Sequence, residues 1–239
     1  MLARNPGLVP IGADNVDSRL GGGIEPGALH ELFAATSDDT STTVGFAALL
    51  ALRCAADKPL FWVRDDRVER DAGRVYAPGL AELGSAIHGM TVITAQDTVS
   101  ILRAAADIAA CSAAGVVIIE PWARAPELDL TASRRLALAA ARSGVMTLIV
   151  RAGAEPAPSA AQTRWRVGSA PSRAFAAGAP GLPAFDISLL RHRGGIAGFD
   201  TRVEWDCDQR TFRETPLSGG IPALAVFGAR DPRSEVRAA

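Results

Sequence analysis

Residues 20–43 read LGGGIEPGALHELFAATSDDTSTT, and this stretch decides how the chain is interpreted. A glycine-rich turn precedes a short apolar segment with the alternation of a strand, and a polar loop then leads into an apolar helix. This order places the loop where a phosphate-binding loop of the form G-x-x-x-x-G-K-[ST] would lie. Aligned without gaps, the chain has Ala34 at the first glycine, Asp39 at the second, Thr40 at the lysine and Ser41 at the hydroxyl position.

These replacements remove the chemistry of the loop. A working loop holds phosphates through backbone N–H groups, glycine torsions and a lysine ammonium. Asp38 and Asp39 instead place two carboxylates against a polyanion, at a cost of about 1 kcal/mol in water and more in a shielded site. The single lysine, Lys58, lies beyond the following helix and is expected to point away from the loop. We therefore predict a nucleotidase fold with no catalytic residue, no nucleotide cofactor and no ATP hydrolysis.

The segments after the loop alternate between strands and helices, which indicates βαβ units and a parallel sheet. Apolar runs and helical spacing predict strands over 28–33, 60–63, 90–94, 116–119 and 145–150 and helices over 41–56, 97–113 and 130–143. The pattern changes after Arg151. Two Pro-rich segments, 152–162 and 170–184, are predicted to be mobile loops. Further strands are expected over 163–168, 185–192, 201–206 and 210–214, and we predict that they are antiparallel.

Four motifs in order resemble the RecA-type core and, within it, the ImuA family. In recombinase-type ATPases a glycine-rich turn, a short strand and the phosphate loop follow one another as they do here. The motifs are IGADNVDSRLGGGIEPGALHELF over 11–33, PLFWV with RVYAPGLAELG over 59–84, GVVIIE over 115–120, and LRHRGG over 190–195 with VEWD over 203–206. Together they span most of residues 11–214.

The resemblance implies an α/β, RecA-like fold whose mostly parallel sheet, flanked by helices, carries a smaller antiparallel C-terminal extension. Residues 1–214 would form one domain with an N-terminal arm over 1–10, and 215–239 would be a flexible tail. It also implies an accessory role in the SOS response to DNA damage, in error-prone translesion synthesis (SOS mutagenesis). The implied partners are ImuB, a Y-family-like polymerase homologue, and through it a C-family error-prone polymerase, with RecA as a further candidate. DNA contact stays open.

Three carboxylates lie at positions that matter in a working RecA-type core. Glu120 stands where a Walker B carboxylate would order a magnesium-bound water. Because Pro121 follows it and the phosphate loop has lost its lysine, we interpret Glu120 as a strand-end carboxylate with a local hydrogen-bond partner. Asp65 and Asp66 follow the strand 60–63, where a general base would lie. Helix capping and a surface ion pair explain them equally well, and we prefer that interpretation.

Two groups of residues are candidates for contact with DNA or a partner: Arg164, Trp165, Arg166, Arg191, His192 and Arg193. In the first group, arginines with an aromatic can stack on exposed bases. The alternation of a strand instead predicts that Trp165 faces the core and that both arginines face solvent. In the second group, a histidine between two arginines can contact phosphate. The glycines that follow it nevertheless indicate a hairpin turn.

Composition restricts the other classes of function. The net charge of −1 gives no overall footprint of a nucleic-acid-binding protein, although residues 151–213 are mildly basic. The three cysteines are far apart, so no metal site is expected. His30, His88 and His192 form no triad signature, and His30 is expected to be a packed or hydrogen-bonded residue. No secretory signal and no membrane-spanning run are found, and a reduced, cytoplasmic setting is expected.

Three other functions remain open on the sequence. A SulA-type inhibitor of cell division shares the reduced RecA-like core. A RecA-paralogue ATPase with an unusual loop would bind ATP, and its melting temperature would rise with nucleotide. A single-strand DNA-binding module would show salt-sensitive binding that weakens when Arg164 and Arg166 are replaced by alanine.

Overall fold

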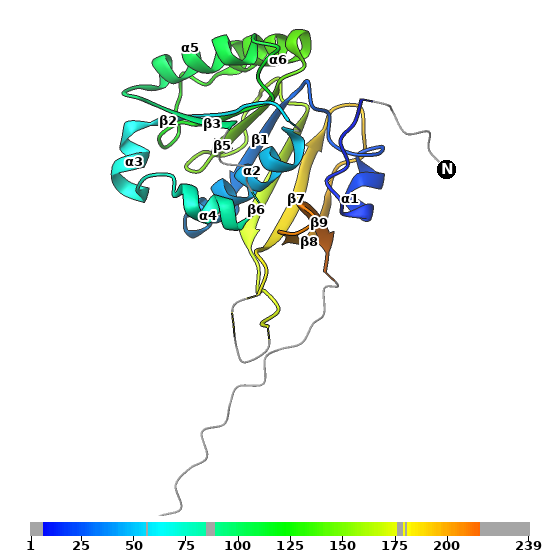
Figure 1. Cartoon of the computed structure of the whole chain (residues 1–239). Coiled ribbons are helices and arrows are strands. Elements are labelled where there is room, and N and C mark those ends of the chain that lie inside the picture. Colours follow the sequence, from blue (N-terminus) through cyan, green and yellow to red (C-terminus); the bar gives the residue numbers. More distant parts are fainter. Residues whose placement is uncertain (1–6, 56, 85–88, 176–178, 180, 216–239) are drawn as a thin grey trace, which may run out of the picture.

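Parallel strands form the centre of the structure, and helices cover both faces of the sheet (Figure 1). The computed structural model describes residues 7–55, 57–84, 89–175, 179 and 181–215. The sequence predictions for His88, for the tail beyond residue 215 and for residues 1–6 of the arm lie outside these residues.

The predicted strands and helices are all found, most of them with bounds within a few residues of those expected. The helix after residue 65 ends at Ala72, before Gly73, and a separate short helix begins at Ala77 with Pro78 in its first turn. In chain order the elements are α1 (Asp14–Arg19), β1 (Leu29–Ala34), η1 (Ser37–Asp39), α2 (Thr40–Cys54), β2 (Leu60–Asp65), α3 (Asp66–Ala72), α4 (Ala77–Glu82), β3 (Met90–Ala95), α5 (Thr98–Ala109), β4 (Val116–Glu120), α6 (Leu130–Ser143), β5 (Met146–Arg151), β6 (Thr163–Ser169), β7 (Ala184–His192), β8 (Phe199–Asp206) and β9 (Thr211–Glu214).

One sheet contains all of these strands in the order β3-β2-β4-β5-β1-β6-β7-β8-β9. The first six in this order run parallel, and β7, β8 and β9 continue the sheet antiparallel. This confirms the predicted class: an α/β, RecA-like core with an antiparallel C-terminal extension.

The prediction that the strand over residues 163–168 is antiparallel is wrong for its pairing with β1 and right for its pairing with β7. β6 pairs parallel with β1 and antiparallel only with β7. Residues 152–162 connect the end of β5 to the start of β6, at the opposite edge of the sheet, without a helix. An extended segment of this length is long enough to cross the length of a strand. Its last residues, 159–161, are buried, so this end of the segment expected to be mobile is packed against the sheet.

The buried side chains form two cores, one on each face of the sheet. In β4, Val116 and Ile118 point into the core shared with α2, whereas Val117 and Ile119 point into the core shared with α5 and α6. All four are fully buried. A continuous β-branched run is expected for a parallel strand that is covered on both faces. Each such side chain stabilises the fold by roughly 1.5–3 kcal/mol through removal from water.

Aspartate caps begin three of the helices, and a glycine ends one of them. Asp65, Asp97 and Asp129 are N-caps whose carboxylates accept backbone N–H groups of the first turns of α3, α5 and α6. Gly144 ends α6 in the left-handed conformation, with φ of +79°. The first of these caps confirms the predicted role of Asp65.

The segment before β1 is fastened to the last strand. Asp17 of α1 is buried, and its carboxylate accepts the N–H groups of Ile11 at 2.8 Å and Gly12 at 2.9 Å. The Ile11 carbonyl accepts the N–H of Phe212 at 2.9 Å, and Asn15 N–H donates to Glu214 Oε1 at 2.6 Å. Residues at the two ends of the described fold therefore lie side by side.

Candidate functional site

The segment that corresponds to a phosphate-binding loop connects β1 to α2. β1 ends at Ala34, and the one-turn helix η1 brings Asp39 to the start of α2. Thr40 donates its hydroxyl to the Ser37 carbonyl at 2.9 Å, and Ser41 is exposed. Lys58 lies beyond α2, as predicted, and donates to the Ser112 carbonyl at 2.9 Å.

The Asp39 carboxylate points into this loop and uses its donors. It accepts the Thr36 N–H at 3.1 Å and the Thr36 hydroxyl at 2.7 Å through Oδ2, and the Ser169 N–H at 2.7 Å through Oδ1. Asp39 is buried, and the hydrogen bond from Ser169 is the main reason that its pKa lies below the usual range. An internal carboxylate thus already accepts two backbone N–H groups beside the degenerate loop.

At the Walker B position, Glu120 is bonded by two neighbours on β2. Its Oε2 accepts Trp62 Nε1 at 2.9 Å and Arg64 Nε at 3.0 Å. Arg64 also donates to the Gly73 carbonyl at 3.0 Å. Burial raises the pKa of Glu120, and the charge and hydrogen bonds of its partners oppose the shift only in part. Glu120 has the local hydrogen-bond partners that its interpretation as a strand-end carboxylate requires.

The carboxylates of Asp65 and Asp66 stabilise the start of α3. Asp65 accepts the Arg67 backbone N–H at 3.0 Å and its guanidinium at 2.8 and 2.7 Å. Burial alone would raise the pKa of Asp65, but these hydrogen bonds outweigh it and hold the pKa below the usual range. Asp66 pairs with Arg70 at 2.9 Å on the surface. Capping and a surface ion pair are thus both present, as the preferred interpretation requires.

His30 is buried in the sheet with both ring nitrogens bonded. Its Nε2 lies 2.8 Å from the Glu25 carbonyl, so Nε2 carries the proton, and Nδ1 accepts from the Thr163 hydroxyl at 2.8 Å. Burial lowers the pKa of His30 to about 4. His30 is therefore the neutral, hydrogen-bonded packing residue that we expected.

The first group of candidate contact residues divides between core and surface. Trp165 is buried, as predicted, and Arg166 is exposed. The expectation that both arginines face solvent is wrong for Arg164, which is buried and donates from Nε to Glu31 Oε2 at 2.8 Å. Alternation holds at Arg166 but fails at Arg164, because Glu31, Ala157 and Ser159 bond the Arg164 guanidinium and cover this part of the face.

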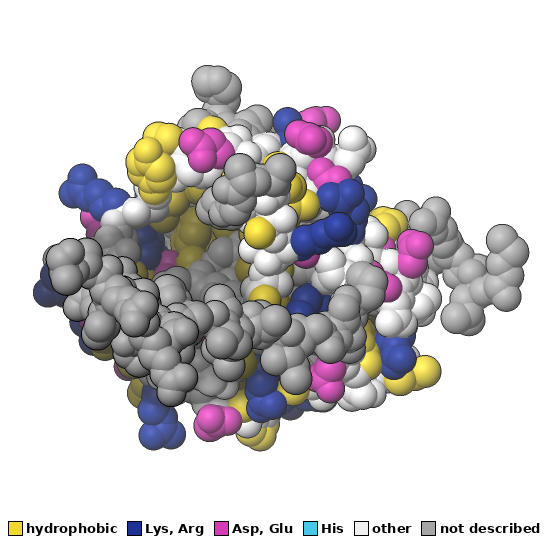
Figure 2. Space-filling model, turned by 90° about the horizontal axis from the view of Figure 1, so that it is seen from below, with side chains coloured by type: hydrophobic (Ala, Val, Ile, Leu, Met, Phe, Trp, Pro, Cys, Tyr) yellow, Lys and Arg dark blue, Asp and Glu magenta, His cyan; other side chains and the backbone are white. Residues whose placement is uncertain are grey.

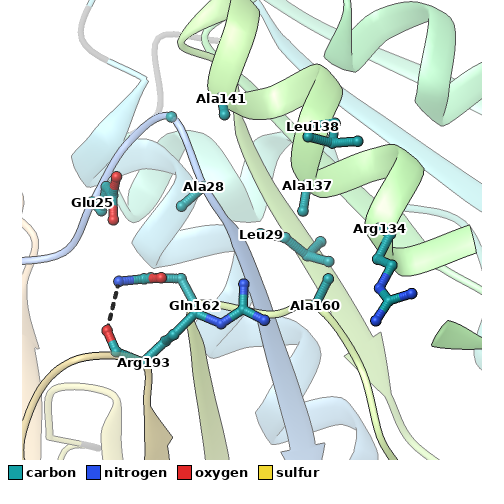
Figure 3. A pocket seen from close by; sticks show the side chains of 11 residues that line it. Glu25, Ala28, Leu29, Arg134, Ala137, Leu138, Ala141, Ala160, Gln162 and Arg193 are labelled. Carbon is teal, nitrogen blue, oxygen red and sulfur yellow. Dashed lines mark hydrogen bonds between the residues drawn. The ribbon is translucent and has the colours of Figure 1, made fainter. Parts of the chain in front are cut away.

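The second group lies at the hairpin between β7 and β8. Residues 193–198 connect the two antiparallel strands, which agrees with the predicted turn. Arg191 is half-buried on β7, and the Nδ1 atom of His192 is buried without a hydrogen-bond partner. Arg193 is exposed at a pocket of about 400 Å³ (Figure 3).

This pocket lies at the starting end of β1. Figure 3 shows Leu138 and its neighbouring alanines on α6 facing the β1 side chains, with Gln162 and Arg193 below them. Gln162 Nε2 donates to the Arg193 carbonyl at 3.1 Å. The wall of the pocket is therefore mainly apolar, with Arg134 and Glu25 at its margins. The two groups of candidate residues lie on neighbouring strands, because the β6–β7 register sets Arg164 opposite Arg191. Their side chains differ in exposure, since Arg164 is buried whereas Arg166 and Arg193 are exposed.

A row of buried charges on β5, β1 and β6 was not identified from the sequence. Arg151 and Arg164 flank the carboxylate of Glu31, and all three are buried. Glu31 Oε2 also accepts the Ser159 hydroxyl at 2.7 Å. The signal was present, since Arg151 directly follows the apolar run 145–150, but a strand-end arginine is not by itself a site.

Among the residues that the structure describes, the face opposite the α5–α6 layer carries side chains of both charges. Figure 2 shows Lys and Arg side chains interspersed with Asp and Glu around a hollow that has hydrophobic side chains in its wall. No group of three or more His, Cys, Asp and Glu is placed to hold a metal ion within the residues that the structure describes. None of the helices in the described ranges has the length and apolarity that crossing a membrane requires.

Comparisons with known proteins agree with this geometry. Over 212 residues the chain is 31% identical to the protein ImuA of Caulobacter vibrioides, in both strain NA1000 / CB15N and strain ATCC 19089 / CIP 103742 / CB 15. The match covers 80% of this chain and 81% of each relative. The crystal structure of the RadB recombinase superposes with a TM-score of 0.58 at 15% identity, covering 87% of this chain and 100% of that one. A comparison with protein-family models finds no match.

Proposed function

The chain belongs to the ImuA family, and on this basis we propose that it is a non-catalytic, RecA-like accessory protein of SOS-induced, error-prone translesion DNA synthesis. In this role it acts through contacts with other proteins and does not turn over ATP. ImuB, and through it a C-family error-prone polymerase, are the proposed partners, and RecA is a further candidate. The setting proposed is the cytoplasm.

The position of Asp39 is the main support for the proposal that the protein does not hydrolyse ATP. Its carboxylate bonds to the N–H groups of Thr36 and Ser169, beside a loop that has no lysine ammonium and neither glycine. A triphosphate would have to displace an anion that is held by three hydrogen bonds and would meet repulsion from Asp38. Glu120, bonded to Arg64 and Trp62, is likewise committed within the protein and offers no free carboxylate to a magnesium ion.

Thermal unfolding in the presence of nucleotide tests this part. We expect no change in melting temperature with millimolar ATP and magnesium, and no phosphate release. If ATP bound with a dissociation constant one hundredth of its concentration, the native state would gain about 2.7 kcal/mol. For a domain of this size that is a shift of roughly 5–10 °C. An intact RecA-type ATPase measured in parallel serves as the positive control, and a shift in this chain would contradict the proposal.

Co-purification tests the accessory role. The tagged chain, recovered from DNA-damaged cells, is expected to bring ImuB with it, and the same chain is expected not to inhibit the tubulin-like division GTPase. Inhibition of that GTPase without recovery of ImuB would favour the SulA-type alternative. Gel shifts with single-stranded DNA at two salt concentrations would identify a DNA-binding module by a strong dependence of affinity on salt.

A further inference from the structure

Arg151 at the end of β5 is a buried cation that the described structure leaves incompletely bonded. Its side chain is 7% exposed, and its Nε and Nη1 atoms have no hydrogen-bond partner. Only Nη2 donates, to the Arg124 carbonyl at 3.3 Å. A guanidinium has five N–H donors and is always charged, so most of its bonding capacity is free.

The nearest carboxylate does not neutralise this charge. Glu31 is bonded by Arg164 at 2.8 Å and by Ser159 at 2.7 Å, so the buried row contains two guanidinium groups and one carboxylate. Burial lowers the pKa of Arg151, with Glu31 opposing this shift and Arg164 adding to it. A buried charge without a full partner is unfavourable, and an anion placed beside Arg151 would remove that penalty.

Arg151 lines a groove that is large enough for a segment of chain. The groove has a volume of about 1330 Å³ and is formed by residues 34–37, 124–126, 128–130 and 151–158. This volume exceeds the roughly 300–1,000 Å³ of a typical small-molecule pocket. Ala123 and Ala125, on either side of Arg124, have left-handed φ values of 49° and 44°. Such conformations are strained for alanine and persist where the surroundings hold them.

The lining selects among anions. Most of it is alanine, proline and leucine, with no aromatic residue on which a base could stack and no lysine. Asp129 and Glu155 stand on the same wall as Arg124 and Arg151, so the lining has no net charge and opposes a polyanion. A single carboxylate with apolar neighbours suits Arg151 and the walls together, because one anion beside the guanidinium offsets its buried charge while the apolar walls pack against the neighbouring side chains.

We propose that this groove binds an extended peptide segment of a partner protein, with one Asp or Glu carboxylate bonded to Arg151 and flanking apolar side chains against residues 125–126, 128–130 and 152–158. The inference rests on the proposed function in one respect, namely that the protein acts through contacts with other proteins. It names the surface and the chemistry of such a contact.

The test is a selection of phage-displayed random short peptides on the purified full chain, followed by binding measurements with the synthetic peptides recovered. We expect peptides with one acidic residue between apolar residues. Replacing that residue by Asn or Gln, or using the variant Arg151→Met, should weaken binding about tenfold to a hundredfold. The matched control is Arg142→Met, since Arg142 is an exposed arginine on α6 outside the groove, and it should leave the affinity unchanged.

The stability of Arg151→Met supplies a second readout that needs no peptide. Because methionine removes an incompletely paired buried charge, the variant should melt at the same temperature as the original chain or higher. Recovered peptides without acidic enrichment, equal binding to Arg151→Met, or a lower melting temperature of this variant would each overturn the proposal. Peptide binding without recovery of ImuB would count against the proposed function alone, whereas recovery of ImuB without acidic peptides would count against the groove alone.

Discussion

The internal hydrogen bonds of Asp39 lead to a quantitative prediction for Asp39→Asn. The carboxylate accepts three hydrogen bonds in a buried position, two from Thr36 and one from Ser169. An asparagine amide has one oxygen, so its NH₂ group must face the donors of one of these two residues. Hydrogen bonds to a charged group contribute roughly 1.5–3 kcal/mol each, but bonds that share one side chain do not add fully. We expect the free energy of unfolding to fall by about 2–4 kcal/mol.

The effect should depend on pH in a defined direction. The folded pKa of Asp39 lies below its unfolded value, which is close to 3.9. The stabilisation by this carboxylate is therefore complete above that unfolded value and is lost as the pH falls through the folded pKa. Urea unfolding at pH 7 and at steps below pH 4 measures the difference between the original chain and Asp39→Asn. A variant with unchanged stability at pH 7, or a difference that grows on acidification, would refute the internal role of Asp39.

Three further predictions concern the rest of the fold. Glu120→Ala leaves Arg64 buried without its carboxylate and should lower the free energy of unfolding by roughly 3–5 kcal/mol. Glu120→Gln keeps an acceptor for Trp62 and should lower it by less. Equal losses for the two variants in urea unfolding would assign the effect to packing. The His30 imidazole should not titrate by NMR until the pH approaches about 4, and because the unfolded value is near 6.5, stability should fall by about 3 kcal/mol as the pH drops from 6.5 to 4; titration near pH 6.5 would contradict its buried, neutral state. Gly144→Ala should lower the free energy of unfolding by about 1 kcal/mol through φ alone, since nothing lies within 4 Å of the added methyl, whereas Gly45→Ala inside α2 should raise it by a similar amount, and effects of the same sign would be inconsistent with this reasoning.

The alternation of strands and helices was predictable because it follows from local patterns. Val116–Ile119 is apolar at every position, as a strand covered on both faces must be, and Asp65, Asp97 and Asp129 stand where helices need a cap. The replacement of the glycines and the lysine of the phosphate loop was equally predictable, since it depends only on which residue types occupy fixed positions. These features need no knowledge of what lies across the sheet.

The contacts of the site could not be predicted, because they join residues far apart in the sequence. Asp39 bonds to Ser169, which is 130 positions away, and no local pattern connects them. Arg164 was expected in solvent, because strand alternation gives no warning that Glu31 and Ser159 cover this position of a face that is solvated at Arg166. The parallel pairing of β6 depends on the path of residues 152–162, which composition does not reveal.

The fastening of the first helix to the last strand has a consequence for biosynthesis. Asn15 and Ile11 find their partners in Glu214 and Thr211, 199 and 200 positions further along. A nascent chain cannot form these contacts until β9 has emerged from the ribosome, and contacts of such high sequence separation slow folding in general. The contacts of Ile11 and Asn15 must therefore wait for the synthesis of β9, which makes the nascent chain before β9 the stage at which a chaperone would matter most.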